Sequence, residues 1–177
     1  MTKPLGTGTL FAAACQAGGR GRWIDNALTS MVQSNRRAAE CLHAMGATAC
    51  TDITGFGLLG HLVEMTRPSG VDAEIDLSAL PILDGAEETV AAGVVSSLQP
   101  ANVRLRRALR NQAEMVAHPR YPLVFDPQTA GGLLASVPAG RADDCLARLR
   151  ALGYVHAAKI GRVTAQGEPL EPIVLNP

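Results

Sequence analysis

The stretch from Ala49 to His61 constrains this chain most, because it sets one carboxylate in a glycine-rich turn between two ordered elements. The run Ala47 to Ile53 has the composition of a buried strand, and Leu58 to Thr66 that of a short helix. Asp52 therefore stands at a strand end beside a helix N-terminus, where N–H groups and the helix dipole favour anions. A divalent metal can bridge a carboxylate there to phosphate. The turn thus indicates a Mg-nucleotide or acyl-phosphate site.

Each residue of this turn also has a structural interpretation. Asp52 beside glycines fits a solvated turn or an Asx turn. Gly55 and Gly57, with Gly60, are explained equally well by turn geometry and by backbone access to phosphate. Thr51 and Thr54 favour capping of the following helix over ligand contact. From the residues alone, both interpretations stay open.

Hydrophobic spacing predicts the other elements, beginning with a strand from Thr2 to Leu5 that opens into a glycine turn. The predicted helices cover Ile24 to Met45, ended by Gly46, then Pro81 to Val95, Val103 to Val116 with Asn102 as N-cap, and Ala142 to Leu152. The further strands cover Val71 to Leu77, Leu123 to Asp126, Leu133 to Val137 and Val155 to Val163. This order predicts an α+β fold, an α/β sandwich with a mixed β-sheet covered by helices, in a single domain over residues 1–177.

Composition argues against several classes of partner. Sixteen basic and sixteen acidic residues give a net charge of zero, so no overall field attracts nucleic acid or an acidic membrane. The four cysteines form no CxxC pair and are expected to be reduced structural thiols. No apolar run is long enough to cross a bilayer. We therefore expect a cytoplasmic protein that binds neither nucleic acid nor membrane.

Four polar residues elsewhere have a stronger structural interpretation than a functional one. Lys3 precedes a glycine turn and could hold phosphate as a point charge, although a surface strand Lys is the commoner role; no P-loop motif is present. Asn35, on an apolar helix stripe, predicts a structural hydrogen bond to a loop. Asp126 before Pro127 fits a turn. His61 has no Ser or Cys partner at a telling spacing, so no nucleophilic triad is supported.

Three ordered motifs resemble selenophosphate synthetases. The run Thr51-Asp52-Ile53-Thr54-Gly55-Phe56-Gly57-Leu58-Leu59-Gly60-His61 is similar to that family's signature. Before and after it stand Thr2-Lys3-Pro4-Leu5-Gly6-Thr7-Gly8 and Phe125-Asp126-Pro127-Gln128-Thr129-Ala130-Gly131-Gly132-Leu133-Leu134. The resemblance extends from Thr2 to Thr164 and corresponds to the C-terminal half of the family, a domain of the aminoimidazole ribonucleotide synthetase type.

The resemblance implies a function and a set of site residues. The full enzyme makes selenophosphate, AMP and phosphate from selenide, ATP and water, with Mg²⁺. Asp52 would be a metal ligand, and the nucleotide-contacting candidates are Lys3, Thr51, Thr54, Gly55 and Gly57. The N-terminal ATP-binding half, with its catalytic Cys or selenocysteine, matches nothing in this chain. No catalytic residue is therefore expected in it, and alone it should be inactive.

The same resemblance sets the partners and the alternatives. ATP and selenide would bind through the full-length enzyme, with the N-terminal domain as partner. A homodimer is a further expectation, because a strand beginning at Thr2 without its partner domain would expose apolar surface. The alternatives are another member of the superfamily, such as aminoimidazole ribonucleotide synthetase or a hydrogenase-maturation dehydratase, or a non-catalytic binding module that stands alone.

Overall fold

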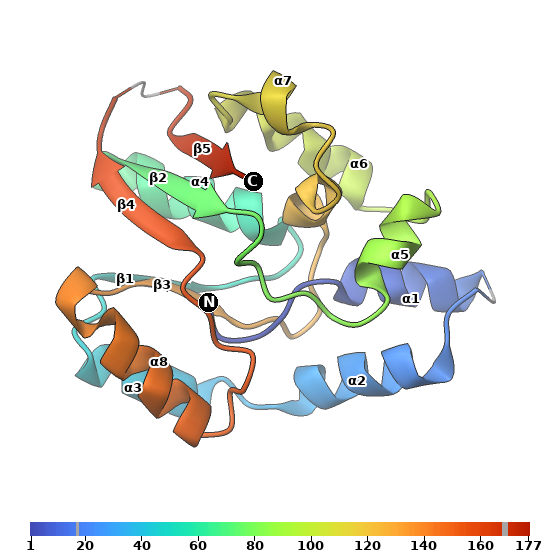
Figure 1. Ribbon diagram of the computed structural model, residues 1–177, viewed down its shortest axis with the longest axis horizontal. Coiled ribbons are helices and arrows are strands. Elements are labelled where there is room, and N and C mark those ends of the chain that lie inside the picture. Colours follow the sequence, from blue (N-terminus) through green and yellow to red (C-terminus); the bar gives the residue numbers. More distant parts are fainter. Residues whose placement is uncertain (17, 168–169) are drawn as a thin grey trace.

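The computed structural model describes residues 1–16, 18–167 and 170–177, and its helices surround two small β-sheets (Figure 1). The α-helices are α1 (Thr7–Cys15), α2 (Gly21–Val32), α3 (Arg36–Ala44), α4 (Gly57–Ser69), α5 (Ala86–Ala91), α6 (Gln99–Asn102), α7 (Gln112–Met115) and α8 (Ala142–Ala151). The 3₁₀ helices are η1 (Val103–Ala108), η2 (Tyr121–Phe125) and η3 (Ala139–Arg141). The strands are β1 (Ala49–Asp52), β2 (Val71–Asp76), β3 (Leu133–Ser136), β4 (Gly161–Ala165) and β5 (Ile173–Asn176).

The strands confirm the α+β prediction but divide the expected sheet in two. β1 pairs with β3 in an antiparallel ladder, and β2 is the central strand of a mixed sheet in the order β4-β2-β5. β4 is antiparallel to β2, whereas β5 is parallel to it. β5 was not predicted. Its partner β2 was predicted as a strand, and the pairing shows that β2 is the central strand of its sheet.

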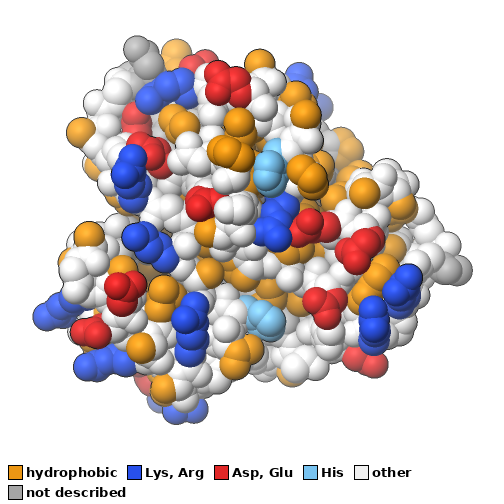
Figure 2. Space-filling model, viewed as in Figure 1, with side chains coloured by type: hydrophobic (Ala, Val, Ile, Leu, Met, Phe, Trp, Pro, Cys, Tyr) orange, Lys and Arg blue, Asp and Glu red, His pale blue; other side chains and the backbone are white. Residues whose placement is uncertain are grey.

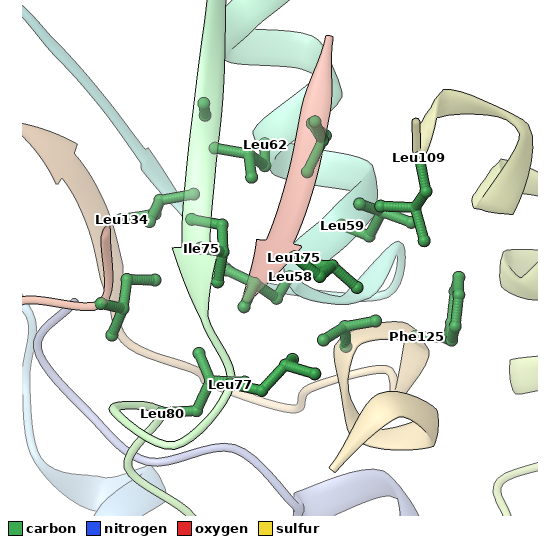
Figure 3. Packing of buried hydrophobic residues seen from close by; sticks show 14 of the residues in the cluster. Leu58, Leu59, Leu62, Ile75, Leu77, Leu80, Leu109, Phe125, Leu134 and Leu175 are labelled. Carbon is green, nitrogen blue, oxygen red and sulfur yellow. The ribbon is translucent and has the colours of Figure 1, made fainter. Parts of the chain in front are cut away.

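The main hydrophobic core lies between α4 and the mixed sheet. Leu58, Leu59 and Leu62 project from α4 toward Ile75 and Leu175 of the strands (Figure 3). A second cluster lies between α3, α8 and β3, and a third joins α1, α2 and α5. On the face shown in Figure 2, basic and acidic side chains are interspersed. No helix among the described residues is long and apolar enough to cross a membrane.

The helix predicted from Ile24 to Met45 is in fact two helices, and Tyr154 explains the break. Its hydroxyl donates to Ser34 O at 2.6 Å and accepts from Ala38 N at 3.0 Å. Ser34 Oγ also accepts from Arg36 N. These bonds take up backbone groups that a continuous helix would pair internally, so α3 starts afresh at Arg36. Gly46 ends α3 as predicted, with φ +78°.

Three further predictions were wrong where tertiary contacts overrode local pattern. The helix predicted over Val103 to Val116 is interrupted because Arg110 N donates to Ile173 O at 2.9 Å, next to a parallel bridge between Leu109 and Ile173. The strand predicted over Leu123 to Asp126 is η2, a fully buried apolar run, and such runs are ambiguous by pattern. The helix predicted over Pro81 to Val95 is only α5.

Three smaller predictions also differ from the structure. The strand predicted over Val155 to Val163 begins only at Gly161. Thr2 to Leu5 forms isolated strand-like hydrogen bonds rather than a ladder. Of the four cysteines, Cys41 and Cys145 are buried in the core, whereas Cys15 and Cys50 are exposed.

Gly85 offers a test of how α2 packs on α5. It has φ +85°, and a Cβ there would overlap the ring of Trp23. Gly93 has a similar φ of +80° with open space around it. We expect Gly93→Ala to reduce the free energy of unfolding by about 1–2 kcal/mol through backbone strain alone. Gly85→Ala should reduce the free energy of unfolding by about 1–3 kcal/mol more than Gly93→Ala does, because its Cβ overpacks against Trp23. Equal losses in urea unfolding would show that Trp23 does not constrain this junction.

Candidate functional site

The three sequence motifs meet at one junction, and the Gln128 side chain holds it together. Its Oε1 accepts from Gly6 N at 3.1 Å and from Thr7 N at 3.2 Å, both at the start of α1. Its Nε2 donates to the backbone oxygen and to Oδ2 of Asp126, each at 2.8 Å. Its backbone N–H donates to Thr54 O at 2.9 Å. Gln128 is only 4% exposed, so these bonds are shielded from water.

Asp52 ends β1 on the outside of this junction. Its side chain is exposed, and no hydrogen bond or ion pair to its carboxylate is found among the described residues. Mg²⁺ is usually held by one or two carboxylates together with phosphate and water, and an open carboxylate suits that role. The described residues contain no group of three or more His, Cys, Asp or Glu side chains able to hold a metal. Asp52 therefore fits one ligand of a shared site.

The turn after Asp52 is held in place by His61, a residue for which no partner was predicted. Thr54 N donates to His61 Nε2 at 3.0 Å, and Thr54 Oγ1 lies 3.1 Å from the same nitrogen. His61 Nδ1 lies 3.1 Å from Glu64 Oε2, and the ring of Phe56 lies 5.6 Å from the imidazole. His61 is only 5% exposed. The spacing of seven residues between Thr54 and His61 hid this contact, because it spans a turn.

The other turn residues have distinct roles. Gly57 has φ +69°, and its N–H donates to Thr54 O at 3.1 Å, so this N–H is not free for phosphate. Gly55 is exposed, with open space where a Cβ would lie. Thr51 Oγ1 donates only a long bond of 3.4 Å to Asp52 O. Within the described part of the chain no side chain caps α4, so the predicted capping role of Thr51 and Thr54 is wrong.

Lys3 is buried rather than on the surface, which corrects the commoner expectation for a strand Lys. The residue is 2% exposed, and its Nζ donates to Ala130 O at 3.1 Å. No carboxylate lies within 4.0 Å of Nζ in the described part of the chain. Burial lowers the pKa of Lys3. A buried ammonium with one neutral partner is suited to an added anion.

Asn35 and Asp126 also belong to the junction. Asn35 Nδ2 donates to Gly131 O at 2.8 Å, which agrees with the structural bond predicted from sequence; its Oδ1 is buried and has no partner among the residues that the structure describes. Asp126 is fully buried, and its Oδ2 accepts from Gly8 N at 3.2 Å. Burial raises the pKa of Asp126 to about 7, although bonds from Gln128 and Gly8 oppose the rise. Aspartate before proline suggested a turn and gave no signal of this burial.

Asp126 predicts a distinctive pH dependence of stability. In the unfolded chain it releases its proton near pH 4, whereas the folded state retains it to about pH 7. Its stabilising contribution is therefore complete below about pH 4 and is lost as the pH rises to about 7. Asp126→Asn should remove this fall in the free energy of unfolding, measured by urea titration at several pH values.

Asp72 provides the opposite control. Its hydrogen bond from Arg110, 2.6 Å long, lowers its pKa. Its stabilising contribution is present above the unfolded pKa and is lost as the pH falls through the folded one. Asp72→Asn should therefore reduce stability above the unfolded pKa and change it little at the acidic end, where the carboxyl of Asp72 is protonated as well. An unchanged pH profile in Asp126→Asn would contradict the assignment of a buried, protonated carboxyl.

The geometry also fixes the tautomer of His61. Because the Thr54 N–H can only donate, Nε2 must accept, and the proton of a neutral ring must lie on Nδ1, facing Glu64. We expect long-range ¹H–¹⁵N spectra of the imidazole to show this Nδ1–H form. Exposed His43 serves as the reference ring in the same spectra. An Nε2–H form at His61 would show that the Thr54 bond is absent in solution.

Comparison with known proteins agrees with this architecture. The family model "AIR synthase related protein, C-terminal domain" matches residues 8–170. The selenide, water dikinase of Geobacter metallireducens is 40% identical over 166 residues, covering 92% of this chain and 47% of that protein. The Pelobacter propionicus protein of the same name is 38% identical over 176 residues, covering 99% and 50%. The chain thus spans about half the length of these relatives.

Solved structures share the fold. The hydrogenase maturation protein HypE in complex with ATP superposes with a TM-score of 0.67 at 19% identity, covering 98% of this chain and 45% of that one. Thiamine monophosphate kinase from Aquifex aeolicus gives a TM-score of 0.57 at 18% identity, covering 99% and 48%. At such identities the likeness concerns the fold alone. Because the family model matches nearly the whole of this chain, the chain belongs to the AIR synthase related protein, C-terminal domain family.

Proposed function

We propose that this chain is the C-terminal half of an ATP-dependent selenide, water dikinase, and that it completes the active site without carrying the chemistry alone. The full reaction would convert selenide, ATP and water into selenophosphate, AMP and phosphate. The names of the relatives support this proposal, since their identity to the chain reaches 40%. They favour it over aminoimidazole ribonucleotide synthesis or hydrogenase maturation. The alternative to be tested is that the chain is a non-catalytic binding module that acts alone.

The observation that carries the proposal is the open carboxylate of Asp52 at the edge of a rigid junction. Its turn is fixed by His61 and Gln128 through Thr54, whereas the carboxylate itself contributes no contact among the described residues. Phosphoryl transfer depends mainly on positioning and charge neutralisation. A Mg²⁺ ion held here would supply charge neutralisation at the phosphates. Asp52 would hold it together with ligands from the N-terminal half.

Neighbouring groups would assist binding of the phosphates. We assign Lys3 as the cation that faces phosphate, since its charge has no acidic partner within the described residues. Gly55 would offer a close backbone approach, and Thr51 and Thr54 their hydroxyl groups. Gly57 would shape the turn, because its N–H is already bonded to Thr54 O. In this proposal the N-terminal half supplies the nucleophile and most metal ligands, so this chain alone is inactive.

Asp52→Asn should separate activity from stability. In a complete synthetase that contains this chain, the change should reduce selenide-dependent AMP formation by at least about 10²-fold, as for loss of one electrostatic stabiliser. Because Asp52 makes no fixed contact, the free energy of unfolding should change by only about 1 kcal/mol or less. Turnover at saturating Mg²⁺ and urea unfolding are the measurements.

Asp84 is the matched control. It is an exposed aspartate before a glycine and a helix, in a different loop, and its carboxylate accepts a long bond of 3.5 Å from Asn26, the one bond found for it among the described residues. Asp84→Asn should leave turnover unchanged. If Asp52→Asn keeps near-normal turnover, or if it unfolds the protein, Asp52 is a structural turn residue. Selenide-dependent AMP formation by the isolated chain would refute the assignment of chemistry to the other half.

A further inference from the structure

Asn102 is a buried amide that joins the turn after Asp52 to the chain at Phe125. It was predicted to cap the helix that follows, but among the described residues its side chain makes no capping bond. Its Nδ2 donates instead to Gly55 O at 2.8 Å and to Phe125 O at 3.0 Å. Both partners are carbonyl oxygens, which only accept, so the NH₂ end of the amide must face them. Asn102 is only 6% exposed, so both bonds are shielded from water.

The chain at Gly55 forms a tight β-turn over residues 54–57. Gly57 N donates to Thr54 O at 3.1 Å, and Phe56 has φ −84° and ψ −2°. These angles match the third residue of a type I turn. The peptide between Gly55 and Phe56 is the central peptide of this turn, and its flip would give a type II turn with the same closing bond. The closing bond therefore does not decide which way the central peptide faces.

Asn102 sets the orientation of this central peptide. The C=O and N–H groups of a trans peptide point in opposite directions. Gly55 O is held inward by a buried amide, so Phe56 N–H is turned outward. This outer side is open to solvent, because Gly55 is exposed and Phe56 is 55% exposed. Within the described part of the chain no partner is found for Phe56 N–H, whereas Gly57 N–H is already bonded.

The second bond, to Phe125, gives the turn a fixed base. A Cβ on Gly57 would lie 2.9 Å from the carbonyl carbon of Phe125 and 3.0 Å from its oxygen. The two backbones therefore touch at a position where Gly57 has no side chain. Packing brings the carbonyls of Gly55 and Phe125 to one amide, and neither can turn away without losing its donor.

We propose that Asn102 is a positioning residue of the phosphate site, which turns Phe56 N–H toward a phosphate group of the bound nucleotide. This inference rests on the proposed function, since it places phosphate at the Asp52 turn. Phosphate oxygens accept hydrogen bonds, and a bond to a charged acceptor is stronger than one between neutral groups. Asn102 would not touch the ligand. It would hold the donor in the required orientation before the ligand arrives, which lowers the cost of binding.

Two substitutions separate this role from simple packing. Asn102→Leu keeps nearly the same volume but leaves Gly55 O buried without a donor, which favours the flipped peptide. Asn102→Ala leaves a small polar space that a water molecule can fill, and the water can donate to both carbonyls. A positioning role therefore predicts the larger loss of nucleotide binding in Asn102→Leu. A packing role predicts the larger loss in Asn102→Ala, because of the cavity.

In a complete synthetase that contains this chain, Asn102→Leu should raise the KM for ATP at least about fivefold, through loss of a hydrogen bond to a charged group. The kcat should change less than about twofold, because this bond holds the phosphate equally in the substrate complex and the transition state. Asn102→Ala should raise the KM for ATP by about twofold, since water replaces most of the lost donor function.

Asn111 is the matched control. Its Nδ2 donates to Leu175 O at 2.7 Å and its Oδ1 accepts from Leu175 N at 3.1 Å, so it also bonds the backbone twice. These bonds hold β5 rather than the turn. Asn111→Leu should lower the thermal midpoint of unfolding, as Asn102→Leu does, but should leave the KM for ATP unchanged.

The orientation of the peptide can be measured in the chain alone, without nucleotide or metal. The Hα protons of Gly55 and the amide proton of Phe56 come close only when the central peptide is flipped. Their nuclear Overhauser effect should be weak in the parent chain and in Asn111→Leu, and stronger in Asn102→Leu. If Asn102→Leu does not fold, Asn102→Ala takes its place in both measurements, with Asn111→Ala as its control.

Three results would overturn the proposal. They are an unchanged KM for ATP in the Asn102 variants, a larger KM in Asn102→Ala than in Asn102→Leu, and an unchanged Overhauser effect in the substituted chain. The proposed function fails by a separate result, which is normal turnover of Asp52→Asn. If Asp52→Asn loses turnover while the Asn102 variants keep their KM for ATP, only the positioning role is wrong.

Discussion

The buried amide of Gln128 is the interaction on which the rest of the site depends. One side chain links the Gly6 turn, the start of α1, Asp126 and, through its backbone, Thr54. Gly6 lies 122 residues from Gln128 in sequence, and Thr54 lies 74 residues from it. Removing one partner from a buried hydrogen bond leaves the other partner unsatisfied, which is costly away from water. Loss of the amide would leave N–H groups of the α1 start without partners, and the Asp52 turn would lose its support from the second loop.

The sequence predicted best those elements whose boundaries are set locally. Gly46, with a positive φ, ends α3 as predicted. β1, β2 and β3 follow apolar or alternating runs. The errors arise where a distant part of the chain, through a side chain or its backbone, competes for backbone groups. Tyr154 breaks the predicted long helix, and the pairing of Arg110 N with Ile173 O interrupts the next one. Periodicity within a segment contains no information about such partners.

The candidate site shows the same division. The position of Asp52, at a strand end before a glycine turn, could be predicted from sequence because both features are local. The burial of Lys3 and Asp126 could not, since it results from the 126–132 loop packing on the amino-terminal segment. His61 was missed for another reason. A triad search looks for Ser or Cys, whereas His61 accepts a backbone N–H from Thr54 and thereby fixes the turn.

The amino-terminal segment connects the β3 edge with the candidate site. Thr2 bonds the β3 edge, Lys3 bonds Ala130, and Gly6 and Thr7 bond Gln128, all within a few residues. These bonds restrict the position of Lys3, the cation that we assign to phosphate. Ordering a group before a ligand arrives lowers the entropy that binding must remove. The packing that buries the amino-terminal segment would therefore also order the phosphate-facing cation of this half of the synthetase.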